Sequence, residues 1–292
     1  MTYARSVAPT RRAELAVAIR PGEHACCRLS QADDRERLGA GFVREGLRRG
    51  HKVVYLCDGD DVTALVRRLL ELDPAFEPAR ARGQLDARRA RDAYLPDGRF
   101  EPDRMLEAVR DEYRRALSEG YRGLSLTGEM TWALCDRSSS DALSSYESRV
   151  ARGYDHRELS ILCQYDHARF APGVLANLAE AHDIDVSPEL APIGRDGELA
   201  AAHDRLNDAL RLAGELDFGC AQTVADVLDA HFHGPLRLDL ADLQFVDVAG
   251  MRALRGRTGQ RVTIIPASDA VRRLLGLMGW DTDPAIEILE AG

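Results

Sequence analysis

Residues 238–254 read LDLADLQFVDVAGMRAL, and this stretch decides the fold of the C-terminal part of the chain. At its start, in PLRLDL (235–240), leucines alternate with charged residues, which predicts a strand with one buried face. A helix is expected to begin at Val248–Ala249–Gly250, directly after Asp247. The backbone N–H groups at the start of a helix point outward, and the helix dipole favours negative charge there. The stretch therefore predicts a strand, a tight turn and a helix, with a turn surface suited to an anion.

The residues around this stretch continue an alternation of strands and helices. ALRLAGELD (209–217) predicts a strand and a turn, and residues 221–233 predict a helix. RVTIIP (261–266) predicts another strand, and Ser268 is a suitable N-cap for a last helix that ends at Gly279. The C-terminal block is therefore expected to be a small α/β unit of about a hundred residues.

The N-terminal block alternates in the same way. VVYLC (53–57) is apolar at every position, as in a strand that is covered on both faces. Further strands are expected at HACCRL (24–29), GLSLT (123–127) and LSILC (159–163), and helices over residues 33–49, 61–72, 102–119 and 141–152. Strands that alternate with helices imply a parallel sheet with helices on both faces.

The segment VSPELAPIGRDGELA (186–200) separates the two blocks and is rich in proline, glycine and charge. Such a composition is typical of a linker between domains. The sequence therefore predicts an N-terminal extension (1–19), a first domain (20–185), this linker, and a second domain (201–292).

Composition excludes several function classes. A formal net charge of -9 argues against a general nucleic-acid binder, which needs a basic face. The chain has no apolar run long enough to span a bilayer, and its N-terminus does not resemble a signal peptide, so we expect a cytoplasmic protein without direct nucleic-acid or membrane partners. The single lysine, Lys52, does not lie in a GK[ST] phosphate loop, which argues against ATP hydrolysis. The six cysteines include no C-x-x-C pair, so a zinc ribbon is not indicated.

Three pieces of the C-terminal block carry a resemblance to a known family: LAGELD (212–217), LDLADLQFVDVAGMRAL (238–254) and ASDAVRRLLGLMGW (267–280). In their order and spacing they resemble the STAS domain of anti-sigma factor antagonists. The resemblance implies a second domain of the STAS α/β fold whose partner is an anti-sigma factor of the ATPase-kinase type. It places the partner-binding site at Asp247, Val248, Ala249, Gly250 and Met251.

Val248 stands where phosphorylatable members of this family carry serine or threonine. A valine has no hydroxyl, so the chain has no phosphoacceptor at this position. A phosphate there would otherwise be held readily by the amides of the helix start. Two interpretations remain open: the turn still binds a partner, without control by phosphorylation, or Val248 packs and the turn is only scaffold.

Four pieces of the N-terminal block match a second family, at residues 22–58, 93–106, 121–134 and 159–170. They resemble the MEDS domain, a sensory module named after regulators of methanogens and methylotrophs. The family's His-x-Cys start is matched by His24 and Cys26, although Cys27, Arg28 and Leu29 follow where aromatic residues are common. The resemblance implies a fold like that of the RecA and KaiC ATPases with the phosphate loop lost.

In an open parallel sheet, ligands bind beyond the carboxyl ends of the strands. We therefore expect one crevice lined by His24, Cys26, Cys57, Glu129, Trp132, Cys163, Gln164 and Tyr165. Such a crevice suits a small-molecule ligand, and its thiols and imidazole also leave a thiol sensor or a metal site open. The spacing of these residues assigns no metal-ligand set, no cofactor and no catalytic group.

Plainer interpretations compete at several of these positions. Buried cysteine behaves as a small hydrophobic residue, so Cys57 and Cys163 can belong simply to the core. His24 can be held by hydrogen bonds alone. Glu129 needs partners or water, because a carboxylate that follows a buried strand is costly to desolvate.

The two resemblances together favour a non-enzymatic signalling protein. Its first domain would sense a ligand or redox state, and its STAS domain would bind an anti-sigma factor and so control transcription that depends on a sigma factor. One alternative is a scaffold in which STAS domains assemble with themselves or with other STAS proteins, as in stress-sensing complexes. Another is a degenerate nucleotide-binding protein.

Overall fold

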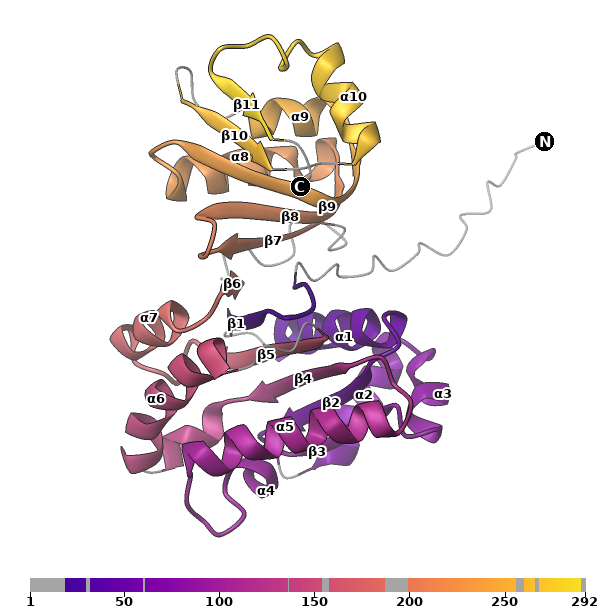
Figure 1. Cartoon of the computed structure of the whole chain (residues 1–292), viewed down its shortest axis with the longest axis vertical. Helices are drawn as coiled ribbons and strands as arrows, with labels where there is room; N and C mark the ends of the chain where they lie inside the picture. Colours follow the sequence, from indigo (N-terminus) through magenta and orange to yellow (C-terminus); the bar gives the residue numbers. More distant parts are fainter. Residues whose placement is uncertain are drawn as a thin grey trace, which may run out of the picture.

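The computed structural model of the chain describes residues 19–29, 32–59, 61–135, 137–153, 158–186, 199–255, 260–265 and 268–289. Within these residues, eleven strands form one continuous sheet with the order β11-β10-β9-β8-β7-β6-β1-β5-β4-β2-β3. The strands are β1 (His24–Leu29), β2 (Lys52–Cys57), β3 (Leu85–Arg89), β4 (Leu124–Glu129), β5 (Leu159–Asp166), β6 (Ile184–Val186), β7 (Leu199–Asp204), β8 (Ala209–Leu216), β9 (Leu236–Val246), β10 (Val262–Ile265) and β11 (Ile286–Ile288). The sheet therefore runs through both halves of the chain (Figure 1).

The N-terminal part is a parallel sheet between two layers of helices, as the sequence predicts. Every strand pair from β6 to β3 is parallel. Its helices are α1 (Ala32–Arg48), α2 (Val62–Leu72), α3 (Phe76–Ala81), α4 (Ala90–Tyr94), α5 (Pro102–Ser118), α6 (Arg137–Gly153), α7 (Pro172–Glu180) and the 3-10 helix η1 (Thr131–Cys135). Helices α4 to α7 cover one face of the sheet, and α1 to α3 cover the other. The covered faces explain why β2 is buried along its whole length.

The C-terminal part packs three helices against one face of its strands. They are α8 (Phe218–His231), α9 (Val248–Leu254) and α10 (Asp269–Leu277). The alternating leucines of β9 point into this core and are fully buried. Ser268 caps α10 by accepting a hydrogen bond from the backbone N–H of Val271, as its position in the sequence indicates.

The other face of β9 differs from the sequence-based expectation. The alternation of leucine and charge predicts a solvent-facing Asp239, yet this residue is only 2% exposed. Its carboxylate accepts hydrogen bonds from the guanidinium groups of Arg20 and Arg211. A pattern of period two identifies the two faces of a strand, but it does not show that the polar face is covered by paired charges.

The two parts of the chain are joined through β6 and β7. Strand β6 pairs with β1 in parallel and with β7 antiparallel. Val186 therefore ends one strand and Leu199 begins another, while residues 187–198 and the N-terminal residues 1–18 lie outside the described ranges. The predicted domain boundaries within those segments stay a prediction. In the described residues, no helix has the length and apolarity needed to cross a bilayer.

Several short elements carried no clear pattern in the sequence: α3, β3, α4, α7, β6, β7 and β11. Strands β6 and β11 have only three residues each, too few for a period to show. Strand β3 reads LDARR and lies at the edge of the sheet, where a strand needs little apolar character.

Candidate functional site

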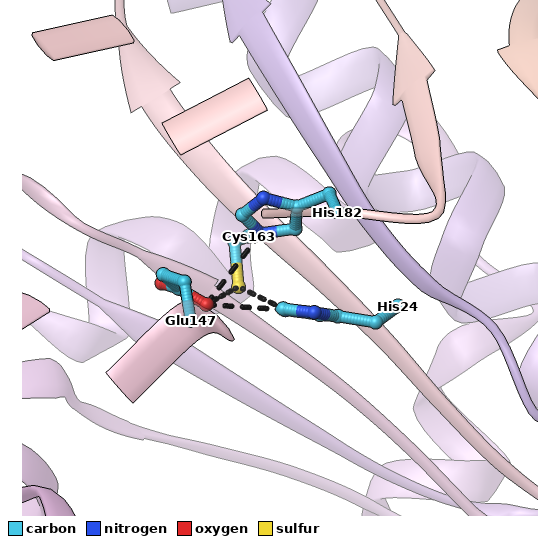
Figure 2. A group of neighbouring side chains, drawn as sticks. All are labelled: His24, Glu147, Cys163 and His182. Atoms are coloured by element: carbon cyan, nitrogen blue, oxygen red, sulfur yellow. Dashed lines mark hydrogen bonds and ion pairs between the residues drawn. The ribbon is translucent and has the colours of Figure 1, made fainter. Parts of the chain in front are cut away.

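A buried group of four polar side chains lies on the face of the sheet that α4 to α7 cover. It consists of His24 on β1, Cys163 on β5, Glu147 on α6 and His182 in the turn between α7 and β6. We call these residues the four-residue cluster. The side chains of His24, Cys163 and His182 point toward the Glu147 carboxylate (Figure 2). None of them is more than 4% exposed.

The Glu147 carboxylate lies at the centre of the contacts in this cluster. Its Oε2 lies 3.1 Å from His24 Nε2 and 3.5 Å from His182 Nε2, and the Cys163 thiol donates to it over 3.7 Å. Its Oε1 accepts a hydrogen bond of 2.6 Å from the Tyr165 hydroxyl. His24 Nε2 also lies 3.4 Å from Cys163 Sγ.

Burial opposes charge on each of the four side chains of this cluster. It lowers the pKa of His24 to about 3. Burial, with the charge of His24, also lowers the pKa of His182 to about 3. Burial raises the pKa of Glu147 above its usual value and raises the pKa of the Cys163 thiol well above its usual value. In the described residues no lysine or arginine pairs with Glu147.

The sequence prediction named part of this cluster and missed the rest. His24, Cys163 and Tyr165 were candidates, and the structure brings them together around Glu147. The position of Glu147 in the sequence could have identified it as a buried carboxylate. It falls within the apolar stripe of α6 formed by Leu143, Tyr146 and Val150, where a carboxylate must be buried. His182 gave no comparable signal.

The predicted single crevice is divided by the sheet. Cys57 packs in the core on the α1 to α3 face, whereas Cys163 packs in the core on the opposite face. Gln164, next along β5, bonds to Tyr55 and Thr127 through its amide nitrogen, at 3.1 and 2.7 Å. Successive residues of a strand point to opposite faces, so strand-end residues need not share a pocket.

Glu129 and Cys26 each have their own partners. Glu129 ends β4 and accepts a hydrogen bond of 2.8 Å from the backbone N–H of Asp58. Burial raises the pKa of Glu129, with that hydrogen bond acting in the opposite direction. The Cys26 thiol lies on the same face as Cys163 and donates to Asp185 over 3.7 Å.

Trp132 belongs to an aromatic core and is fully buried. Its ring stacks on Tyr94 with centroids 4.4 Å apart and lies 4.6 Å from the ring of Phe100. Its indole Nε1 has no hydrogen-bond partner. The expectation that Trp132 walls a pocket at the strand ends is therefore corrected, since the 3-10 helix turns its side chain into the core.

The turn after β9 is built around Asp247, the N-cap of α9. Its Oδ1 accepts a hydrogen bond of 2.7 Å from the Gly250 N–H, which satisfies a donor at the start of α9. Its Oδ2 accepts one of 3.0 Å from the N–H of Phe218, the first residue of α8. One carboxylate thus ties the starts of two helices together. Ala249 is half-buried, and Gly250 and Met251 are buried.

Large apolar side chains are exposed around this turn. Phe218 is 81% exposed, Phe245 is 49% exposed and Val248 is 48% exposed. Phe245 and Val248 flank Asp247 in sequence, and Phe218 lies against it through the hydrogen bond above. We call these three residues the apolar turn surface. The exposure of Val248 opposes the interpretation that it simply packs.

Comparisons with known proteins identify both halves of the chain. Residues 23–183 match the MEDS domain, described as the MEthanogen/methylotroph, DcmR Sensory domain, and residues 199–290 match a family described as Mlab, STAS domain. The transcriptional repressor DcmR of Methylorubrum extorquens is 25% identical over 162 residues, which are 55% of this chain and 58% of the repressor. The chain therefore spans less than two thirds of that relative's length.

Two similar solved structures each match more than half of the chain. The flagellar accessory protein FlaH from Methanocaldococcus jannaschii matches with a TM-score of 0.41 and 16% identity, over 63% of this chain and 78% of FlaH. A KaiC-like protein from Pyrococcus horikoshii OT3 matches with a TM-score of 0.41 and 14% identity, over 60% of this chain and 81% of that protein.

Proposed function

Because the chain belongs to the family of the MEDS sensory domain and continues into a STAS domain, we propose that it is a non-enzymatic regulator of transcription. Its MEDS part receives a signal, and its STAS part binds an anti-sigma factor of the ATPase-kinase type through the turn at Asp247–Met251. Binding releases a sigma factor. The relative named as a transcriptional repressor carries the same kind of sensory part, which supports a regulatory role.

The apolar turn surface is the observation that carries this proposal. Exposed aromatic side chains are costly to leave in water and are enriched where proteins bind one another. Here they gather at the turn that the STAS family uses for its partners. Val248 adds to this surface where phosphorylatable relatives carry a hydroxyl. Binding would therefore depend on apolar contact and would not be reversed by phosphorylation at this residue.

Capture from a lysate of the native host tests the proposal. The immobilised full chain should retain an ATPase-type kinase, and Phe218→Ser should reduce that retention by more than tenfold, since interface aromatics often contribute about 2 kcal/mol or more. Leu206→Ser is the matched control. Leu206 is 74% exposed but lies in the turn before β8, at the opposite end of that strand from Phe218.

Both variants change exposed side chains, so their stability should stay within about 0.5 kcal/mol of the wild type. Equal retention by Phe218→Ser and Leu206→Ser would contradict binding at the turn. Recovery of the chain itself or of other STAS proteins, with no kinase, would favour the scaffold instead.

A further inference from the structure

Four donor atoms of the four-residue cluster lie close enough together to be the ligands of one metal ion. With metal–nitrogen and metal–oxygen bonds near 2.0 Å and a metal–sulfur bond near 2.3 Å, a tetrahedron places its donors roughly 3.3–3.6 Å apart. In this chain the distances are 3.1 Å from His24 Nε2 to Glu147 Oε2, 3.4 Å from His24 Nε2 to Cys163 Sγ, and 3.5 Å from His182 Nε2 to Glu147 Oε2. All the donor atoms lie within 4.8 Å of one another.

We propose that His24, Glu147, Cys163 and His182 bind one divalent transition-metal ion of the zinc type. Imidazole nitrogen, thiolate sulfur and carboxylate oxygen are the donors that Zn²⁺ takes in proteins. Two strands, one helix and one turn supply the four ligands, so a bound ion would join β1, β5, α6 and the turn between α7 and β6 (Figure 2). The site does not depend on the function proposed above.

The hydrogen bonding of His182 orients a lone pair into the cluster. Its Nδ1 lies 2.7 Å from the carbonyl oxygen of Leu178, which can only accept, so Nδ1 carries the hydrogen. In the neutral ring, Nε2 then has a lone pair, and it has no hydrogen-bond partner. This lone pair faces the Glu147 carboxylate at 3.5 Å. Two acceptors face each other favourably only if a proton or a cation lies between them.

A dication would balance the charge of the site. With the ion bound, its ligands would be the Cys163 thiolate, the Glu147 carboxylate and two neutral imidazoles around a 2+ charge. The net charge of the buried site would then be zero, which avoids the cost of burying an unpaired charge. No arginine or lysine among the described residues offers Glu147 that compensation.

Outer hydrogen bonds hold two of the ligands in place. The Leu178 carbonyl orients His182, and the Tyr165 hydroxyl donates 2.6 Å to the Glu147 oxygen that faces away from the imidazoles. Metal ligands are commonly fixed by such partners. Four protein ligands fill a tetrahedron and leave no open position, so the ion would have a structural or sensing role and would not act on a substrate.

Cobalt substitution tests the site in the full chain. Co²⁺ accepts the same ligands, and a cobalt–thiolate bond gives a charge-transfer absorption band. Every sample carries Cys135→Ser, because Cys135 is exposed while the other five cysteines are buried. Protein produced in cobalt-supplemented medium should contain one Co²⁺ per chain and show the band.

Substitutions then locate the metal. Cys163→Ser should abolish the thiolate band, and Glu147→Gln, which keeps the shape of the side chain, should weaken Co²⁺ binding at least about tenfold. Cys27→Ser is the matched control, since Cys27 is equally buried on β1 but packs on the opposite face. A folded chain that holds neither Co²⁺ nor Zn²⁺, or a band that survives Cys163→Ser, would overturn the proposal.

Discussion

Val248 stands at the position where the resemblance to STAS domains of anti-sigma factor antagonists implies a phosphoacceptor. It is the first residue of α9, directly after the Asp247 cap, and its side chain is 48% exposed. Because the side chain at this position is exposed, a hydroxyl restored there would be accessible to a kinase.

If the chain retains an anti-sigma kinase from its host, as proposed above, we predict that this kinase phosphorylates Val248→Ser. Intact-protein mass spectrometry after incubation with that kinase and ATP should show the gain of one phosphoryl group. Val248→Ala is the control, because it removes the same apolar atoms without adding a hydroxyl. If the kinase still binds Val248→Ser but does not phosphorylate it, the kinase does not bring its active site to this turn.

Trp132 shows how a side chain in a predicted pocket can instead be part of the core. It is fully buried and packs against Tyr94 and Phe100. Trp132→Ala should therefore lower the free energy of unfolding by about 3–5 kcal/mol, the usual cost of a large cavity. Urea unfolding measures this loss. A change below about 1 kcal/mol would indicate an exposed or loosely packed ring.

At the scale of elements, Asp247 joins the starts of α8 and α9. Both of its carboxylate oxygens accept backbone N–H groups, one from each helix. Asp247→Ala should cost roughly 2–3 kcal/mol, because it removes a cap and a second hydrogen bond to a charged group. Ser268→Ala removes an ordinary single cap from α10 and should cost only about 1 kcal/mol. Equal shifts of the urea midpoint would contradict the double role of Asp247.

Most of these elements could be predicted because each follows a local pattern. The apolar run of β2 and the leucine alternation of β9 appear in the structure as the sequence indicates. The cluster could be predicted only in part, since Glu147 and His182 meet His24 through the topology of the sheet. Asp239 shows the same limit, because its burial depends on Arg20 and Arg211, which are distant in sequence.

At the scale of the whole molecule, a network of buried charges connects the two parts. Arg211 on β8 is 2% exposed and binds Glu23, Asp204 and Asp239 at 2.7, 2.7 and 3.3 Å. Glu23 precedes β1 of the sensory part, whereas the other residues belong to the STAS part. Breaking a buried ion pair by removing one partner typically costs about 3–5 kcal/mol.

Asp239 makes part of this stability depend on pH. Burial acts to raise its pKa, but the hydrogen bonds and charges of Arg20, with Arg211, outweigh burial and lower it. A carboxyl group whose pKa is lower in the folded state contributes stability above its unfolded value, near 3.9, and loses it as the pH falls further.

We therefore predict that Asp239→Asn is less stable than the wild type at pH 7 and loses less stability on acidification below about pH 4. Glu23 shares Arg211 and has a pKa that burial raises, so its contribution has the opposite sign. Glu23 is present in both proteins, so the difference between their curves reports the removal of the Asp239 charge. Parallel curves of urea midpoint against pH would contradict this assignment.

The same network, with the shared sheet, should make the two parts unfold together. Strand β6 pairs with β1 on one side and with β7 on the other, and one apolar cluster includes Ala25 of β1 and Ala213 of β8.

Calorimetry of the wild type should show a single unfolding transition. Arg211→Met, which removes the shared partner of Glu23, Asp204 and Asp239, should split it into two, with the STAS part melting first. Arg114→Met, at an exposed pair on α5, should change nothing measurable, because such pairs contribute about 0–1 kcal/mol. Two transitions already present in the wild type would show that the junction does not couple sensor and STAS part.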